Sequence, residues 1–133
     1  MENAVGHAFR DAGLLKRALT HSSAQKSSGD NERLEFLGDR VLGLIVADML
    51  YRAYPEEHEG HLALRHTALV QRSAIARAAA EMGLGAHLIL SSGEMKAGGS
   101  SKDTILADAF EALIGAVWID GGYTAAEKFV VKY

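Results

Sequence analysis

The longest amphipathic stretch of the chain runs from residue 31 to residue 51. At 3.6 residues per turn, it places a mostly apolar row of side chains along one side of a helix. The row consists of Leu34, Leu37, Val41, Leu44, Ile45 and Asp48. We therefore expect a long helix that is capped by Asp30 or Asn31 and ends before Pro55.

Shorter segments on both sides of this stretch also have helical composition. We expect these helices at about residues 11–19, 61–71, 73–82, 102–120 and 124–133. The polar segment 20–29 and the glycine-rich segment 93–101 are expected to be loops. Residues 84–90 are ambiguous, since the pattern of 88–90 fits a short strand. With one proline among 133 residues, the chain is predicted to form a single all-α domain, a compact fold of several helices.

Cap residues mark several of these boundaries. Asp11 is suited to cap the first of the shorter helices, and Gly83 is suited to end the helix at about 73–82. Ser100 and Asp103 form a capping-box-like start for the helix at 102–120. Gly121–Gly122 is expected to end that helix.

Three acids form a second stripe on the helix expected at 31–51. Glu32, Glu35 and Asp39 stand three or four residues apart, so they share a face that differs from the apolar one. The stripe is either a solvated acidic surface or part of a site. Gly38 and Gly43 each cost roughly 1 kcal/mol relative to alanine inside a helix, which indicates that each allows something to approach closely.

A second carboxylate pair changes the balance between these interpretations. Asp108 and Glu111 lie three residues apart in a segment that is otherwise almost wholly apolar. A helix that is apolar on all sides is buried, and ionised carboxylates are rarely buried without a partner or a metal. Two helices with a carboxylate pair each therefore predict one shared cation site. Ligands that are all oxygen suit a hard ion such as Mg²⁺ or Mn²⁺.

The residues that carry this pattern also resemble a known family. Residues 32–39, Glu-Arg-Leu-Glu-Phe-Leu-Gly-Asp, are similar to the signature of the ribonuclease III endonuclease domain. Residues 14–23, 59–62, 93–99 and 108–115 resemble further segments of that family, in the same order. The resemblance therefore covers essentially the whole chain, and for residues 84–90 it implies a short helix as the alternative to the strand.

The resemblance implies an all-α homodimer that hydrolyses double-stranded RNA with Mg²⁺, for which Mn²⁺ can substitute. The family's products carry 5′-phosphate and 3′-hydroxyl ends with two-nucleotide 3′ overhangs, and structured precursors of rRNA and mRNA are among its substrates. By this resemblance, Glu35, Asp108 and Glu111 are expected to bind the metal, and Asp39 and Glu111 to be the catalytic carboxylates. The alternative is a non-catalytic helical dimer that binds double-stranded RNA through the same fold, although the presence of all four acids favours the enzyme.

Other matched residues are expected around these carboxylates. Glu32 and Glu59 are expected either beside the ligands or facing RNA. Phe36 is expected at the contact between the two subunits, whereas its position alone would make it a core residue. The resemblance leaves roles open for Arg33, for Glu94 and Lys96, and for Arg40, which stands where the family commonly has a small residue.

Motifs of other metal and phosphate sites are missing from the chain. The six histidines form neither an H-E-x-x-H nor a Glu-x-x-His pattern, which argues against a zinc protease and a ferritin-like di-iron protein. We expect all six to be structural or on the surface. Residues 93–99 lack the spacing of a phosphate-binding P-loop.

Composition indicates in which cellular compartment the protein is expected. The chain has no cysteine and hence no disulfide, thiolate zinc site or cysteine nucleophile, which suits a reducing cytoplasm. The N-terminus lacks the pattern of a secretory signal, and the longest apolar runs, 41–47 and 112–119, are too short to span a bilayer. We therefore expect a cytoplasmic protein with no membrane partner and no small-molecule cofactor.

The charge of the chain limits how well it can bind RNA. Its net charge is −3, and omitting the four carboxylates of the expected site leaves only +1. Because phosphate binding calls for a basic surface, duplex binding by this chain alone is expected to be weak. Bacterial members of the family usually continue into a double-stranded-RNA-binding domain. We expect residues 1–133 to be the endonuclease domain without that second domain, and the stop at Tyr133 within a helical pattern favours an excised domain over a natural short form.

Overall fold

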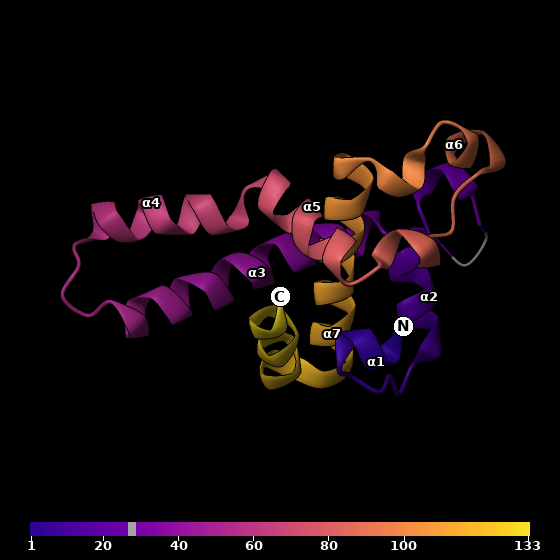
Figure 1. Ribbon diagram of the computed structural model, residues 1–133. Helices are drawn as coiled ribbons and strands as arrows, with labels where there is room; N and C mark the ends of the chain where they lie inside the picture. The colour runs from indigo at the N-terminus through magenta and orange to yellow at the C-terminus, as the bar shows by residue number, and fades with distance from the viewer. Residues whose placement is uncertain (27–28) are drawn as a thin grey trace.

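The computed structural model describes residues 1–26 and 29–133 and places helices along most of that length (Figure 1). The α-helices are α1 (Glu2–Val5), α2 (Ala12–Leu19), α3 (Glu32–Ala53), α4 (Glu59–Val70), α5 (Arg72–Glu81), α6 (Ser92–Lys96) and α7 (Asp103–Lys132). The 3-10 helices are η1 (Ser22–Ala24), η2 (Leu84–His87) and η3 (Gly99–Ser101). Among the described residues, extended pairing is limited to an isolated bridge between Thr20 and Ile89. The all-α prediction is confirmed.

Helix α7 lies at the centre of the fold, with α2, α3 and α5 packed around it (Figure 1). Residues 105–107 and 109–117 are all buried, so the first half of α7 is enclosed on every side. This is the burial expected of a helix that is apolar all round. It also means that the carboxylates of α7 lie inside the protein or at its edge.

The chain reverses direction at Gly122 within α7. Gly122 has φ 79° and ψ −167°, a conformation that side chains with a Cβ rarely adopt. The second half of the element folds back, so that the Phe129 ring lies 5.1 Å from the Phe110 ring, centroid to centroid. Tyr123 donates a hydrogen bond of 3.0 Å from its hydroxyl to Asp48 of α3. The break predicted at Gly121–Gly122 is therefore confirmed, with a further helical segment after it.

Helices α3 and α4 form a hairpin that projects from the rest of the molecule (Figure 1). No residue of α4 is buried. His66 of α4 donates a hydrogen bond of 2.9 Å from Nε2 to the carbonyl oxygen of Gly43 in α3. The imidazole does approach the backbone at Gly43, but a Cβ atom there would lie 3.9 Å from it, an ordinary contact, so within the described part of the chain this approach does not require a glycine. Leu44 of the apolar row is 54% exposed on this hairpin.

Most of the expected boundaries agree with the structure within two residues. Asp11 caps α2 by accepting a hydrogen bond from the Gly13 amide, and Gly83 follows α5 in the left-handed conformation. Helix α3 begins and ends as predicted, with the Asp30 side chain accepting from the Glu32 amide at 3.0 Å. The segment expected as a loop at 20–29 contains η1, and its residues 27 and 28 lie outside the described part of the chain.

The segment from residue 84 to residue 103 differs most from expectation. Residues 84–87 form η2, and Ile89 then pairs with Thr20, so each alternative for 84–90 holds for part of it. The loop predicted at 93–101 is wrong, because the Ser91 side chain caps α6 and η3 follows directly. The capping box at Ser100 and Asp103 is wrong as well, because Lys102 occupies the N-cap of α7. No helix in the described ranges has the length and apolar character needed to cross a bilayer.

Candidate metal centre

The backbones of α3 and α7 touch where Gly38 meets Gly115. A Cβ atom at Gly38 would lie 1.6 Å from the carbonyl oxygen of Glu111, and one at Gly115 would lie 2.4 Å from the carbonyl oxygen of Leu34. Any side chain at either position would therefore push the two helices apart. The close approach predicted at Gly38 is confirmed, and it brings the two carboxylate pairs of the sequence to one place.

Three carboxylates converge beside this helix crossing. Glu35 of α3 and Asp108 and Glu111 of α7 each direct an oxygen atom to a common point, and these three atoms all lie within 4.8 Å of one another. Glu111 is buried, whereas Glu35 and Asp108 are partly exposed, so the group has a closed side and an open side. Such an all-oxygen arrangement fits a hard divalent cation.

Burial and neighbouring charge both penalise ionisation of Glu111. Burial is the larger cause of a rise in its pKa from the usual 4.5 to about 8, and a hydrogen bond with Asp39 adds to it. The negative charges of Asp39, Glu35 and Asp108 raise the pKa further. At neutral pH and without a cation, Glu111 is therefore mostly protonated and donates a hydrogen bond to Asp39.

Glu35 is affected in the same direction. Partial burial is the main cause that raises its pKa, followed by the negative charge of Asp108. Glu32, one turn earlier on α3, is exposed and adds a small further rise through its own charge. The four acids of the centre, Glu35, Asp39, Asp108 and Glu111, repel one another when ionised unless a positive charge lies among them.

A basic side chain approaches the group from α5, a helix that the sequence did not connect with it. Arg72, the first residue of α5, pairs with Asp108 at 3.2 Å between Nη1 and Oδ1. Its Nη1 also donates to the carbonyl oxygen of Thr104 at 3.4 Å. Arg72 lies 36 residues before its partner, so no spacing rule links the two in the sequence.

The remaining predicted site residues lie outside the three converging carboxylates. Glu32 lies at the start of α3, where its negative charge raises the pKa of Glu35. Glu59 is exposed in the first turn of α4, which begins at the far end of the α3–α4 hairpin (Figure 1), and it is not among the converging carboxylates. Phe36 is 59% exposed on α3, which excludes the alternative that it is a core residue of this chain.

Comparison with known protein families shows which fold this centre belongs to. Residues 11–133 match the family model described as ribonuclease-III-like. The chain belongs to the ribonuclease III family. The nuclease domain of ribonuclease III from Campylobacter jejuni is 40% identical, with a TM-score of 0.94 over 98% of this chain and 91% of that one. The description of that structure refers to flexibility in a region involved in dimer formation.

Other ribonuclease III relatives are longer than this chain. Ribonuclease 3 of Nitrosococcus oceani is 48% identical over 126 residues, which are 95% of this chain and 53% of the relative. Dicer from Pichia stipitis is 28% identical, with a TM-score of 0.66 over 88% of this chain and 49% of that one. The chain thus spans about half the length of the curated relatives that it matches.

Phe36 borders a groove on the surface of this ribonuclease III family member. The Arg40 guanidinium lies 3.9 Å from the centre of the Phe36 ring, and it also pairs with Asp39 at 3.4 Å. The groove has a volume of about 890 Å³. Its lining includes Arg17, Arg33, Leu37 and the exposed Ile119.

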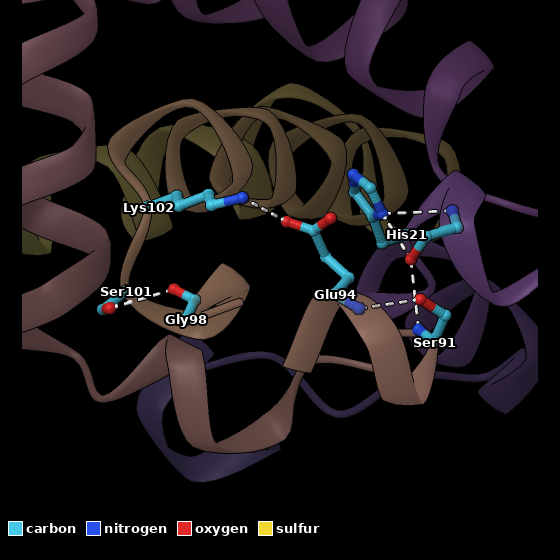
Figure 2. A network of polar contacts seen from close by, with 7 residues as sticks. His21, Ser91, Glu94, Gly98, Ser101 and Lys102 are labelled. Carbon is cyan, nitrogen blue, oxygen red and sulfur yellow. Dashed lines mark hydrogen bonds and ion pairs between the residues drawn. The ribbon is translucent and has the colours of Figure 1, made fainter. Parts of the chain in front are cut away.

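Glu94 belongs to a polar network that includes none of the converging carboxylates (Figure 2). Its carboxylate accepts from Lys102 Nζ at 2.8 Å, and its amide donates to Ser91 Oγ at 3.0 Å. The Ser91 amide in turn donates to the hydroxyl of Ser23, which contacts His21 Nδ1 at 2.8 Å. The network joins α6 to the N-cap of α7 and to η1, so Glu94 has a clear structural role.

Proposed function

We propose that the chain is a metal-dependent endoribonuclease that hydrolyses phosphodiester bonds of double-stranded RNA. The observation that carries this proposal is the convergence of Glu35, Asp108 and Glu111 at the α3–α7 crossing of a ribonuclease III fold. These residues are the proposed metal ligands, and Asp39 and Glu111 are the proposed catalytic carboxylates. The products would carry 5′-phosphate and 3′-hydroxyl ends, with 3′ overhangs.

The donor set favours Mg²⁺ as the ion, with Mn²⁺ as a substitute. All three converging groups supply oxygen, the ligand that both ions prefer. The pKa of Glu111, about 8, shows how unfavourable its negative charge is among the other acids. A divalent cation would remove that penalty, because it favours the ionised form of every carboxylate that it contacts.

The carboxylates divide the work between binding and proton transfer. When bound, a divalent cation lowers the pKa of water and offsets charge on the departing 3′ oxygen. Glu111 lies in the buried wall of the centre, where its carboxylate would bind the cation. Asp39 is hydrogen-bonded to Glu111 and exposed, so it can accept a proton at its carboxylate and release it to solvent.

We further propose that the chain works as a homodimer with Phe36 at the contact. An exposed phenylalanine beside a groove with exposed Ile119 is the kind of surface that a second copy would cover. The similar Campylobacter jejuni structure is described as having a region involved in dimer formation, which supports a second copy as the occupant. Glu59, which is remote from the centre of its own chain, would then be available to face RNA or the partner's centre.

The proposed substrates are structured precursors of rRNA and mRNA, which implies a cytoplasmic setting. The net charge of −3 means that the surface provides little general attraction for phosphate. Binding of a cation at the carboxylates would reduce the local negative charge where the RNA backbone must approach. Duplex binding is therefore expected to depend on the divalent ion as well as on ionic strength.

Cleavage of an end-labelled RNA duplex in Mg²⁺ and in EDTA tests the proposed function. Wild-type protein should cut the duplex in Mg²⁺ only, and Asp108→Asn should reduce the rate by orders of magnitude. Asp103→Asn is the matched control, because Asp103 is exposed on the same helix and outside the carboxylate group. Cleavage in EDTA, or equal rates for the two variants, would contradict the proposal.

The same assay distinguishes the enzyme from a non-catalytic RNA-binding dimer. A protein of that second type would retain the duplex on a filter in Mg²⁺ yet leave it intact. Its binding would also be unaffected by Asp108→Asn at a fixed ionic strength. Analysis of the product ends completes the test, since 5′-hydroxyl products would exclude the proposed direction of hydrolysis.

A further inference from the structure

Arg72 contacts Asp108, one of the three converging carboxylates, from the neighbouring helix α5. Its Nη1 lies 3.2 Å from Asp108 Oδ1, and the same nitrogen donates to the Thr104 carbonyl oxygen at 3.4 Å. The guanidinium is therefore held by two oxygen atoms of α7, one turn apart. Its side chain is 54% exposed and that of Asp108 is 27% exposed, so the pair lies on the open side of the centre.

We propose that Arg72 is a positioning residue that acts as an internal counter-ion for the centre and competes with the divalent cation for Asp108. In the metal-free protein it places one positive charge beside Asp108 and limits the repulsion among the acids. When a cation binds, the guanidinium must either leave Asp108 or remain close to a like charge. This inference rests on the proposed metal-binding role of Asp108.

If Arg72 acts in this way, it lowers the affinity of the centre for the divalent cation. Asp108 has to be released from an ion pair before its oxygen is fully available, and any guanidinium that stays nearby repels the cation. Because Arg72 is half exposed, solvent and salt screen much of this repulsion. We expect removal of the charge to tighten cation binding by about three- to tenfold at low ionic strength, and by less at higher salt.

Mn²⁺ binding measured by electron paramagnetic resonance of the free ion tests this inference. Arg72→Gln should bind Mn²⁺ about three- to tenfold more tightly than wild type, with the difference shrinking as salt is added. Arg72→Lys keeps the charge and should stay within about twofold of wild type. Arg77→Gln, on the exposed side of the same helix and away from the centre, should match wild type.

A purely structural role for Arg72 would produce a different result. Loss of a structural contact would loosen the centre, so Arg72→Gln would then bind Mn²⁺ more weakly than wild type. Either weaker binding or an unchanged affinity for Mn²⁺ would overturn the inference. Asp108→Asn separates this failure from failure of the proposed function. If Asp108→Asn leaves Mn²⁺ binding intact, the proposed metal centre is refuted. If Asp108→Asn abolishes Mn²⁺ binding but Arg72→Gln has no effect on it, only the proposed role of Arg72 is refuted.

Discussion

The raised pKa of Glu111 predicts how the stability of the metal-free protein depends on pH. In the folded protein this carboxyl keeps its proton until about pH 8, whereas in the unfolded chain it loses it near 4.5. Between these values unfolding releases a proton, so stability falls as pH rises through this range. Below pH 4.5 the group is protonated in both states and costs nothing.

The size of the effect follows from the shift. A pKa displaced from 4.5 to about 8 corresponds to a ceiling of about 5 kcal/mol once Glu111 is ionised in the folded state. Water entry and movement of neighbouring side chains reduce such costs, so we expect a loss of about 2–3 kcal/mol between pH 5 and pH 9. For a chain of 133 residues this equals a fall in melting temperature of about 6–10 °C.

Thermal unfolding in EDTA across this pH range provides the assay. Glu111→Gln cannot ionise at this position, so its stability should not fall between pH 5 and pH 9. The variant should therefore be more stable than wild type at pH 9 and no more stable than wild type at pH 5. Glu81→Gln, which removes an exposed carboxyl on α5, should follow the wild-type curve. Parallel curves for wild type and Glu111→Gln would refute the reasoning. Millimolar Mn²⁺ should reverse the order at pH 9, because the ionised carboxylate then has a cation to bind.

Three further predictions concern the dimer, the helix crossing and RNA binding. Phe36→Ala should weaken the dimer that analytical ultracentrifugation detects at micromolar concentration. Met95→Ala, at an exposed position on α6, should leave the dimer unchanged. A strictly monomeric wild type would contradict this prediction. Gly38→Ala should lose about 3 kcal/mol or more in urea unfolding, because its methyl would overlap the Glu111 carbonyl, while Gly43→Ala should be neutral or up to about 1 kcal/mol more stable. Duplex binding by the chain, measured by filter retention, should be weak and fall steeply with salt, and tight binding at physiological salt would reveal a basic surface that the net charge conceals.

The sequence carried enough information to predict the helices and the convergence of the carboxylates. Spacing along a helix is a local property, so the pairs Glu35–Asp39 and Asp108–Glu111 could be assigned to faces before the fold was known. The glycine at residue 38 added the expectation of a close approach, and the structure identifies α7 as the partner. The family resemblance then agreed with a site that residue types had already suggested.

Features that depend on contacts between distant elements could not be predicted in this way. The position of Arg72 beside Asp108 results from the packing of α5 on α7, which no periodicity encodes. The glycine-rich segment before α7 has the composition of a loop, yet Ser91 and the Lys102–Glu94 pair hold it as α6 and η3. Composition gave the local preference there, and tertiary contacts overrode it.

Single-turnover cleavage of a duplex by Glu111→Gln, measured beside its duplex affinity in Ca²⁺, tests the central claim most directly. The substitution preserves size and, in the cation-bound protein, removes one negative charge and one ionic ligand oxygen, so it should not hinder the approach of the phosphate backbone. We predict that the variant folds, dimerises and binds duplex at least as well as wild type, yet cleaves it orders of magnitude more slowly, since the loss belongs to the transition state. Near-normal cleavage by Glu111→Gln would remove this residue from the site and contradict the four-carboxylate account.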